Sequence, residues 1–146
     1  MRVVALLACA ACWTDPPPSH APVAPVAVRV VPREHAQRSV WIGEYLCTQG
    51  LTSLALTIET RGETATAVFA FGPVDSNPLL PNGSYRMTGT MLEANGVVTY
   101  RLDPEVWIDQ PFGYVMVGLV ARVEGDRLIG RIVHEGCDGL LARRAR

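Results

Sequence analysis

The sequence predicts an all-β protein, an antiparallel up-and-down meander of about eight strands that closes into a small barrel. Three observations favour this fold class. After residue 38, apolar and polar residues alternate with a period of two, and no stretch keeps the 3.6-residue period of a helix. Glycine and proline number 13 and 11 among 146 residues, while charged residues make up only 18%, which is typical of short strands joined by turns. Tight-hairpin signals also separate successive strands. A β-sandwich of the same strands is the main alternative.

A strand is predicted wherever alternate positions are apolar and turn residues mark both ends. Leu54, Leu56 and Ile58 share one face of the second strand, and Phe69 and Phe71 share one face of the third. The predicted strands cover residues 40–48, 53–59, 67–71, 84–91, 98–102, 114–123, 128–134 and 139–144.

Two hairpins predict their own register. Asn95-Gly96 is the strongest two-residue hairpin signal, because both residues tolerate positive φ. A two-residue loop there pairs Met91 with Tyr100 and places Thr90 opposite Arg101, so that apolar meets apolar and polar meets polar. The same reasoning for the turn at Gly125-Asp126 predicts the pairs Val123–Leu128, Leu119–Ile132 and Val117–His134.

A disulfide is predicted at the seam of the barrel. In a meander of eight strands, the first and last strands run antiparallel, so closure brings the end of one beside the start of the other. Cys47 lies near the end of the first strand and Cys137 just before the last. An exported chain without another cysteine beyond its leader is expected to bond this pair.

The first residues resemble an export signal. Arg2 gives a minimal positive start, residues 3–8 are apolar, and Leu6-Leu7-Ala8-Cys9 is similar to a lipobox, whose cysteine is lipidated after cleavage. We therefore expect residues 1–12 to be a lipoprotein-type signal segment and Cys9 to be a lipid anchor that holds the protein in the cell envelope. Plain secretion, or release into the periplasm, is the alternative.

A proline-rich segment separates this leader from the domain. Residues 13–37 cannot build a core and favour extended conformations, so they predict a tether. Residues 38–146 are then a single domain of ordinary size. The net charge of −1 produces no global field that attracts nucleic acid, so we expect no nucleic-acid partner. We expect a monomer that contacts the membrane only through its anchor.

Meander topology assigns the connections to two ends. The tight turns at 61–63, 95–96 and 125–126 share one end. The connections at 49–50, 72–83, 103–113 and 135–138 share the other, and two of these are long. Long loops at one end of a rigid barrel are a usual place for a binding site. The competing interpretation is that they only cap the barrel.

The end with the long loops is also acidic, and its four segments contain no arginine. Such a rim suits a cation, a basic partner or a hydroxyl-rich ligand. Trp107 is the best single contact, since tryptophan is enriched among binding hot spots, and its competing role is a structural plug. The predicted binding residues are Asp75, Asp103, Glu105, Trp107, Asp109 and Asp138.

Patterns for chemistry are weak. His134 is the only histidine of the domain and is expected to be a packed residue at the edge of the core. Asp75-x-Asn77 hints at calcium ligation but lacks the remaining ligands of a calcium loop. We therefore predict no catalytic residue, no metal and no cofactor. A glycan-acting enzyme that uses rim carboxylates ranks below the binding hypotheses.

The run from Trp41 to Gly50 (WIGEYLCTQG) resembles a small uncharacterised β-domain of exported bacterial proteins. Such domains occur in small lipoproteins and in the tails of caspase-like peptidases. The resemblance continues through Asn82–Tyr85, Asp103–Trp107, Pro111–Val117 and the late Cys137. It implies the domain boundaries and the cysteine pair, and no activity. The opening hairpin is also similar to calycin-type barrels, an analogy of fold that does not transfer function.

These patterns favour two binding functions. The leading hypothesis is a non-catalytic envelope module that binds an unidentified ligand or protein through the acidic rim. The alternative is a lipocalin-like carrier with a small apolar molecule inside the barrel, because eight-stranded barrels either fill their interior or hold one small ligand. The residues that would line such an interior are Phe69, Phe71, Tyr85, Met87, Met91 and Tyr100.

Overall fold

The computed structural model describes residues 36–146 of the chain. This range contains no helix that is long and apolar enough to cross a membrane. Its eight strands are β1 (Gln37–Cys47), β2 (Gly50–Arg61), β3 (Thr64–Gly72), β4 (Gly83–Ala94), β5 (Val97–Asp109), β6 (Gly118–Glu124), β7 (Arg127–Val133) and β8 (Gly139–Arg144). The predicted signal segment with Cys9 lies outside the described residues, as does nearly all of the predicted tether.

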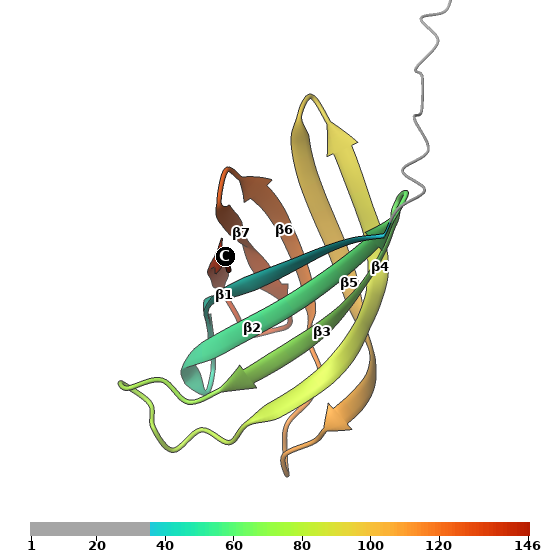
Figure 1. Cartoon of the computed structure of the whole chain (residues 1–146). Helices are drawn as coiled ribbons and strands as arrows, with labels where there is room; N and C mark the ends of the chain where they lie inside the picture. Colours follow the sequence, from blue (N-terminus) through green and yellow to red (C-terminus); the bar gives the residue numbers. More distant parts are fainter. Residues whose placement is uncertain (1–35) are drawn as a thin grey trace, which may run out of the picture. The chain divides into compact units, whose positions relative to one another are not determined.

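The strands form a closed barrel in which each one pairs antiparallel with the next (Figure 1). The barrel closes between β1 and β8, from Trp41 opposite Arg144 to Tyr45 opposite Leu140. The two strands can approach at this seam because Gly43 has no side chain, since a Cβ there would collide with the backbone of Leu141 and Ala142. The predicted meander and barrel are confirmed, and the sandwich alternative is wrong.

The predicted hairpin registers are also confirmed, except for the last predicted pair of the second hairpin. Met91 lies opposite Tyr100 and Thr90 opposite Arg101. The turn between them has φ of 53° at Asn95 and 77° at Gly96, the positive values that a two-residue hairpin loop requires. In the next hairpin, Leu119 pairs with Ile132 and Val123 with Leu128, but this ladder ends at Gly118 opposite Val133. The predicted pairing of Val117 with His134 is therefore wrong.

The structure corrects the prediction around residues 98–117. Strand β5 runs on to Asp109 instead of ending near residue 102, and β6 begins only at Gly118 instead of 114. Beyond Leu102, β5 pairs with β4 through two irregularities in register and has no pairing with β6. The predicted loop 103–113 is wrong for its first seven residues, and the true connection is residues 110–117.

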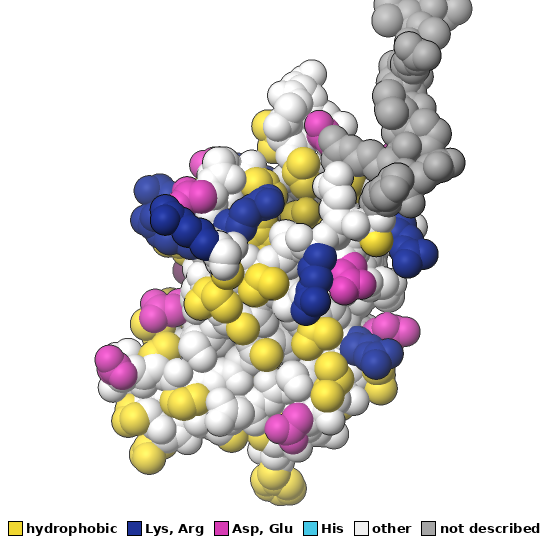
Figure 2. Space-filling view, viewed as in Figure 1, with side chains coloured by type: hydrophobic (Ala, Val, Ile, Leu, Met, Phe, Trp, Pro, Cys, Tyr) yellow, Lys and Arg dark blue, Asp and Glu magenta, His cyan; other side chains and the backbone are white. Residues whose placement is uncertain are grey.

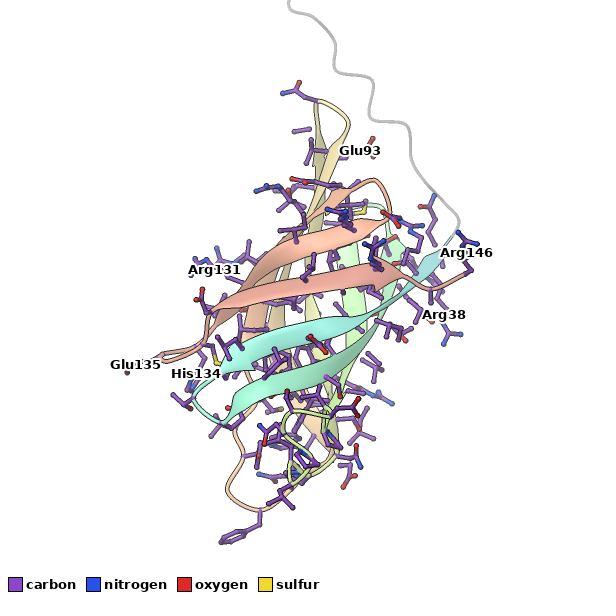
Figure 3. The ribbon with its side chains drawn as sticks, turned by 90° about the vertical axis from the view of Figure 1, so that its left-hand side faces the viewer. Arg38, Glu93, Arg131, His134, Glu135 and Arg146 are labelled. Atoms are coloured by element: carbon purple, nitrogen blue, oxygen red, sulfur yellow. A yellow bond between two sulfur atoms is a disulfide. The ribbon has the colours of Figure 1, made fainter. Side chains whose placement is uncertain are left out.

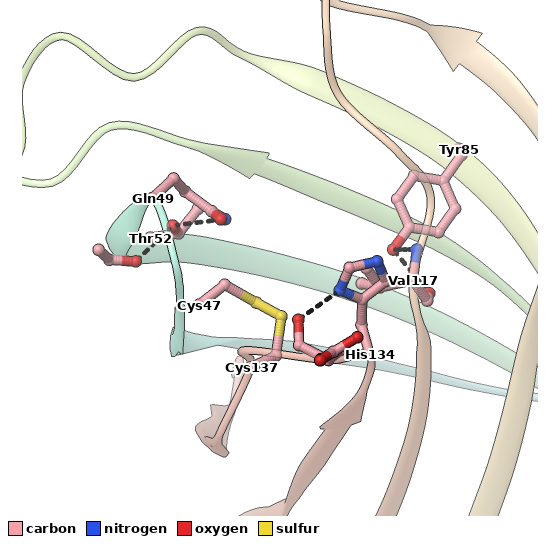
Figure 4. Close-up of a disulfide and its surroundings, with 9 residues drawn as sticks. Cys47, Gln49, Thr52, Tyr85, Val117, His134 and Cys137 are labelled. Atoms are coloured by element: carbon pink, nitrogen blue, oxygen red, sulfur yellow. Dashed lines mark hydrogen bonds between the residues drawn. A yellow bond between two sulfur atoms is a disulfide. The ribbon is translucent and has the colours of Figure 1, made fainter.

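The disulfide between Cys47 and Cys137 is present and joins residues 90 positions apart (Figure 4). Beside it, the amide of Asp138 donates a hydrogen bond of 2.8 Å to the carbonyl oxygen of Leu46. The connection from β7 to β8 is thus fixed to the end of β1 by one covalent bond and one main-chain hydrogen bond.

Candidate binding site at the barrel mouth

The connections lie at two ends of the barrel, as the meander predicts. The tight turns of the β2–β3, β4–β5 and β6–β7 hairpins share one end, which we call the turn end. The other end, which we call the mouth, carries the connections 48–49, 73–82, 110–117 and 134–138. In Figure 1 the connections 73–82 and 110–117 extend away from the tips of those hairpins.

Aromatic side chains fill the barrel below the mouth. Phe69 stacks on Tyr85, with ring centroids 4.9 Å apart, and meets Tyr45 edge to face at 5.5 Å. Phe69 and Met87 are completely buried, and Tyr85 is 1% exposed. The residues expected to line a carrier cavity therefore pack against one another in the core.

Above these rings, a pocket of about 290 Å³ opens at the mouth. Its wall combines the end of β1, the β1–β2 turn, the end of β3 and the two connections 110–117 and 134–138. Among residues 36–146, no arginine, aspartate or glutamate lines it. The residues that give it chemical character are Tyr45, Gln49, Phe71, Tyr85, Tyr114 and His134, with the disulfide Cys47–Cys137 at one side.

The segment 110–117, which we call the mouth segment, folds inward to form one wall. Gly113 has φ of 80°, a conformation that glycine adopts without strain. The ring of Tyr114 stacks on Phe71 at 5.6 Å. The hydroxyl of Tyr85 donates to the carbonyl oxygen of Val117 at 2.9 Å and accepts from its amide at 3.2 Å (Figure 4). The Tyr85 hydroxyl thus bonds both main-chain groups of Val117, as a neighbouring strand would do.

Both buried phenols remain protonated at neutral pH. Burial raises the pKa of Tyr45 far above its ordinary value, although hydrogen bonds with Thr52 and Gln49 oppose the shift. Burial raises the pKa of Tyr85 in the same way, opposed by its hydrogen bond with Val117. The wall of the pocket therefore carries neutral hydroxyl groups.

Two further polar side chains at the pocket are held in place. The amide nitrogen of Gln49 donates to the Thr52 hydroxyl at 3.4 Å. Nδ1 of His134 lies 2.7 Å from the carbonyl oxygen of Glu135. A carbonyl oxygen only accepts, so Nδ1 is the donor in this contact. The hydrogen bonds thus fix the orientation of two polar side chains in the wall of the pocket.

The predicted acidic residues do not line this pocket. Asp75, Asp109 and Asp138 lie in or beside the connections at the mouth, as predicted. Asp103 and Glu105 do not, because β5 continues through them. Glu105 faces a groove on the outer surface of β2–β5, so the predicted position of these two residues in a loop at the mouth is wrong.

Trp107 is half-buried on β5, and its ring meets Tyr85 at 5.2 Å and Phe71 at 6.4 Å, edge to face in both cases. These contacts favour the competing interpretation of Trp107 as a structural plug. A tryptophan available to a partner would have its ring in solvent.

The Asp75-x-Asn77 pattern also has a structural role. The side-chain amide of Asn77 donates to the carbonyl oxygens of Gln49 and Leu51, at 2.8 and 3.4 Å. It thereby ties the connection 73–82 to the β1–β2 turn. Within residues 36–146, no group of three or more His, Cys, Asp or Glu side chains could hold a metal ion.

Sequence reasoning misses the residues that shape the pocket. The run 114–123 is apolar on both faces, which predicts a strand that includes Tyr114 and Val117, and the pattern around His134 predicts a residue of the core edge. Gly113 immediately before Tyr114 is the local signal that could indicate a change of direction there.

No protein-family model, no curated protein and no solved structure matches the chain.

Proposed function

We propose that this chain is a non-catalytic binding module of the cell envelope, and that its site is the mouth pocket. The observation that carries the proposal is the pocket of about 290 Å³ lined by aromatic rings and held polar groups. Ligand pockets typically combine an apolar wall with a few placed polar groups, and this volume is near the lower end of their range. The predicted export, the lipid anchor at Cys9 and the likeness to exported bacterial β-domains belong to the same proposal.

The chemistry of the wall favours a small uncharged molecule with one ring. Phe71 and Tyr114, whose rings stack on each other, line the pocket with apolar surface, while Gln49 and His134 add polar groups. A formal charge on the ligand would find no opposite charge among the described residues of the wall, so its desolvation would be uncompensated. Sugars and phenols have the required combination of an apolar face and hydroxyl groups.

Several features support a binding role over a catalytic one. In the described part of the chain, no carboxylate that could act as a general acid or base lines the pocket. One ring nitrogen of His134 contacts the carbonyl oxygen of Glu135. The two cysteines at the pocket, Cys47 and Cys137, form the disulfide. A carrier with a ligand deep inside the barrel is less favoured, because the aromatic side chains occupy that space.

The test is a binding screen with uncharged ring compounds, namely phenols, methyl glycosides and neutral heteroaromatic rings. Binding is measured by the rise in melting temperature and by fluorescence titration of the tyrosine and tryptophan rings. At least one class should bind the wild-type chain. Val115→Trp, which fills the pocket from a position 60% exposed, should abolish that binding.

Val133→Trp is the matched control, because Val133 is 44% exposed on β7 and does not line the pocket. It should bind as the wild type does. Gln49→Ala should weaken binding by about five- to tenfold, the effect of losing one hydrogen bond. If no class binds, or if Val115→Trp binds normally, the mouth pocket is not the site.

A second candidate function is protein docking on the rim of the mouth. The side chain of Phe112 is wholly exposed and Leu79 is 93% exposed, and acidic Asp75 and Asp109 lie in the neighbouring segments. Apolar side chains beside acids suit a basic protein surface. Replacing Phe112 and Leu79 by serine should remove protein binding and leave small-ligand binding unchanged.

A further inference from the structure

The outer surface of the barrel carries apolar side chains on both sides of the seam between β1 and β8. In Figure 2, hydrophobic side chains gather near the middle of the visible face, where β1 and β2 cross it. In Figure 3 the barrel is turned so that β7, β8, β1 and β2 lie side by side on the face toward the viewer. The area that we call the seam patch consists of Ile42, Leu46, Ile129 and Leu141.

The side chains of the seam patch are neighbours on one surface. Leu141 lies opposite Ile129 in the β7–β8 ladder and opposite Glu44 across the seam. On β1, Ile42 and Leu46 lie two residues to either side of Glu44, so both are diagonal neighbours of Leu141. Ile42 is 52% exposed, Leu46 46% and Leu141 55%. Contiguous exposed apolar side chains are typical of an interaction surface, whereas scattered ones are ordinary.

Two side chains of opposite charge border the seam patch. Glu44 lies on β1 between Ile42 and Leu46, and Arg131 lies on β7 two residues beyond Ile129. Both are exposed, and neither has an ion pair among residues 36–146. Strand β8 lies between them. The patch thus has an unpaired acid on one side and an unpaired base on the other.

The other charges beside the patch lie toward the turn end. Arg122 pairs there with Glu124, and Arg143 pairs with Asp126. Arg127 is also on that side, as the first residue of β7. A partner that covers the aliphatic side chains therefore leaves these ion pairs in solvent at the border of the contact.

Gly139 leaves a gap on the same surface. It lies opposite Arg131 in the β7–β8 ladder, two residues from Leu141, and is exposed. A Cβ built on Gly139 would meet only the carbonyl oxygen of Gly130, at 3.9 Å. The gap can therefore receive an aliphatic side chain of a partner. Leu46, which is exposed on β1, is a side chain of the required kind.

We propose that the seam patch is the interface of a homodimer with two-fold symmetry. In such a contact the same surface serves both copies, so every pairing between unlike residues forms twice. Glu44 of each copy meets Arg131 of the other, and Leu46 of each copy enters the gap at Gly139 of the other. The surface carries both members of each pairing, which is the charge complementarity that a second copy requires.

An unrelated partner fits this surface less well. A basic partner would pair with Glu44 and leave Arg131 without an opposite charge, and an acidic partner would do the reverse. Either way a charge would lose its hydration without compensation. The dimer replaces the monomer that we expected from the sequence. None of the residues in the contact lines the mouth pocket, so the inference is independent of ligand binding there.

The test is sedimentation velocity of the full chain over a wide range of concentration. The wild type should form a dimer that dissociates on dilution. Glu44→Arg and Arg131→Glu should each raise the dimer dissociation constant by at least about tenfold, because like charges then meet at both symmetric contacts. An equimolar mixture of these two variants should dimerise as the wild type does, because each exchanged charge then faces an opposite one.

Arg86→Glu and Glu105→Arg are the matched controls for charge. They make the same two changes in net charge at a groove on the outer surface of β2–β5, away from the seam. Both should dimerise as the wild type does. Residues 1–35 are identical in all variants, so any contribution they make is common to every measurement.

Two further variants test the apolar part of the contact. Gly139→Leu fills the gap and should abolish the dimer. It should leave the melting temperature of the dilute protein unchanged, because Gly139 has no positive φ and a side chain there finds open space. Leu141→Ser should weaken the dimer, whereas Leu92→Ser, at a site on β4 that is 56% exposed, should not.

Three results would overturn the proposal. The first is a wild-type chain that stays monomeric at every concentration. The second is a dimer that Gly139→Leu and Glu44→Arg leave unchanged, because the interface then lies elsewhere. The third is a mixture of Glu44→Arg and Arg131→Glu chains that fails to dimerise although each variant is folded, because the two charges then do not meet.

Discussion

Removing one hydroxyl group tests how the mouth segment is held. Tyr85→Phe keeps the ring, which stacks on Phe69 at 4.9 Å and meets Trp107 at 5.2 Å. It removes only the oxygen that donates to the Val117 carbonyl at 2.9 Å and accepts from the Val117 amide at 3.2 Å. The substitution therefore separates the packing of the core from the attachment of residues 110–117.

The expected loss of stability follows from these two hydrogen bonds. Each one contributes about 1 kcal/mol net, and the main-chain groups of Val117 lose both at once. Val117 is half-buried, so water partly replaces the hydroxyl, which prevents a larger penalty. We expect the free energy of unfolding to fall by about 2 kcal/mol, which corresponds to about 8 °C in melting temperature for a domain of this size.

Urea denaturation measures the loss, and hydrogen exchange at the Val117 amide reports where it occurs. Tyr114→Phe is the matched control, because the Tyr114 hydroxyl has no hydrogen-bond partner among residues 36–146. That variant should change stability by less than about 0.5 kcal/mol. If Tyr85→Phe is equally stable and the Val117 amide stays protected, the mouth segment is held by packing alone and the reasoning is wrong.

Two further predictions concern the aromatic interior. Trp107→Ala should lower the free energy of unfolding by about 3 kcal/mol, because its ring packs on Tyr85 and Phe71; normal stability in urea with loss of binding would instead identify Trp107 as a contact. Stability should also fall above pH of about 10, where unfolded tyrosines ionise while burial keeps Tyr45 and Tyr85 protonated in the fold. The free energy of unfolding should fall by up to about 2.7 kcal/mol per pH unit for two such groups, and by half as much in Tyr85→Phe. An unchanged pH dependence in that variant would contradict this prediction.

The sequence is sufficient to predict the fold wherever two independent local signals agree. The Asn95-Gly96 turn and the alternation of its flanking strands both require Met91 opposite Tyr100, and the structure has that pair. A shift by one residue would move every apolar side chain to the outer face, so the alternatives are strongly disfavoured. The positions of Cys47 and Cys137 add a third constraint at the barrel seam.

The extension of β5 could not be predicted from local signals. Asp103 and Pro104 are residue types typical of turns, and proline is excluded from the middle of most sheets. Here β5 pairs with β6 only up to Leu102, so the following residues lie at a free edge where a missing amide is tolerated. Near Glu105 an irregularity in register takes up one extra residue. How far β5 pairs with β6 is decided by contacts between distant parts of the chain. The sequence of residues 103–109 therefore carries no local signal of it.

The same distinction explains why the place of the candidate site could be predicted and its lining could not. Which loops share an end follows from strand order alone. The shape of the mouth depends on contacts between residues far apart in the chain: Asn77 with Gln49 at a separation of 28, and Tyr85 with Val117 at a separation of 32. Each contact fixes a different connection, and the disulfide fixes one more. A turn at the opposite end is specified by its own two residues, whereas the mouth acquires its form only when the barrel has closed and brought these partners together.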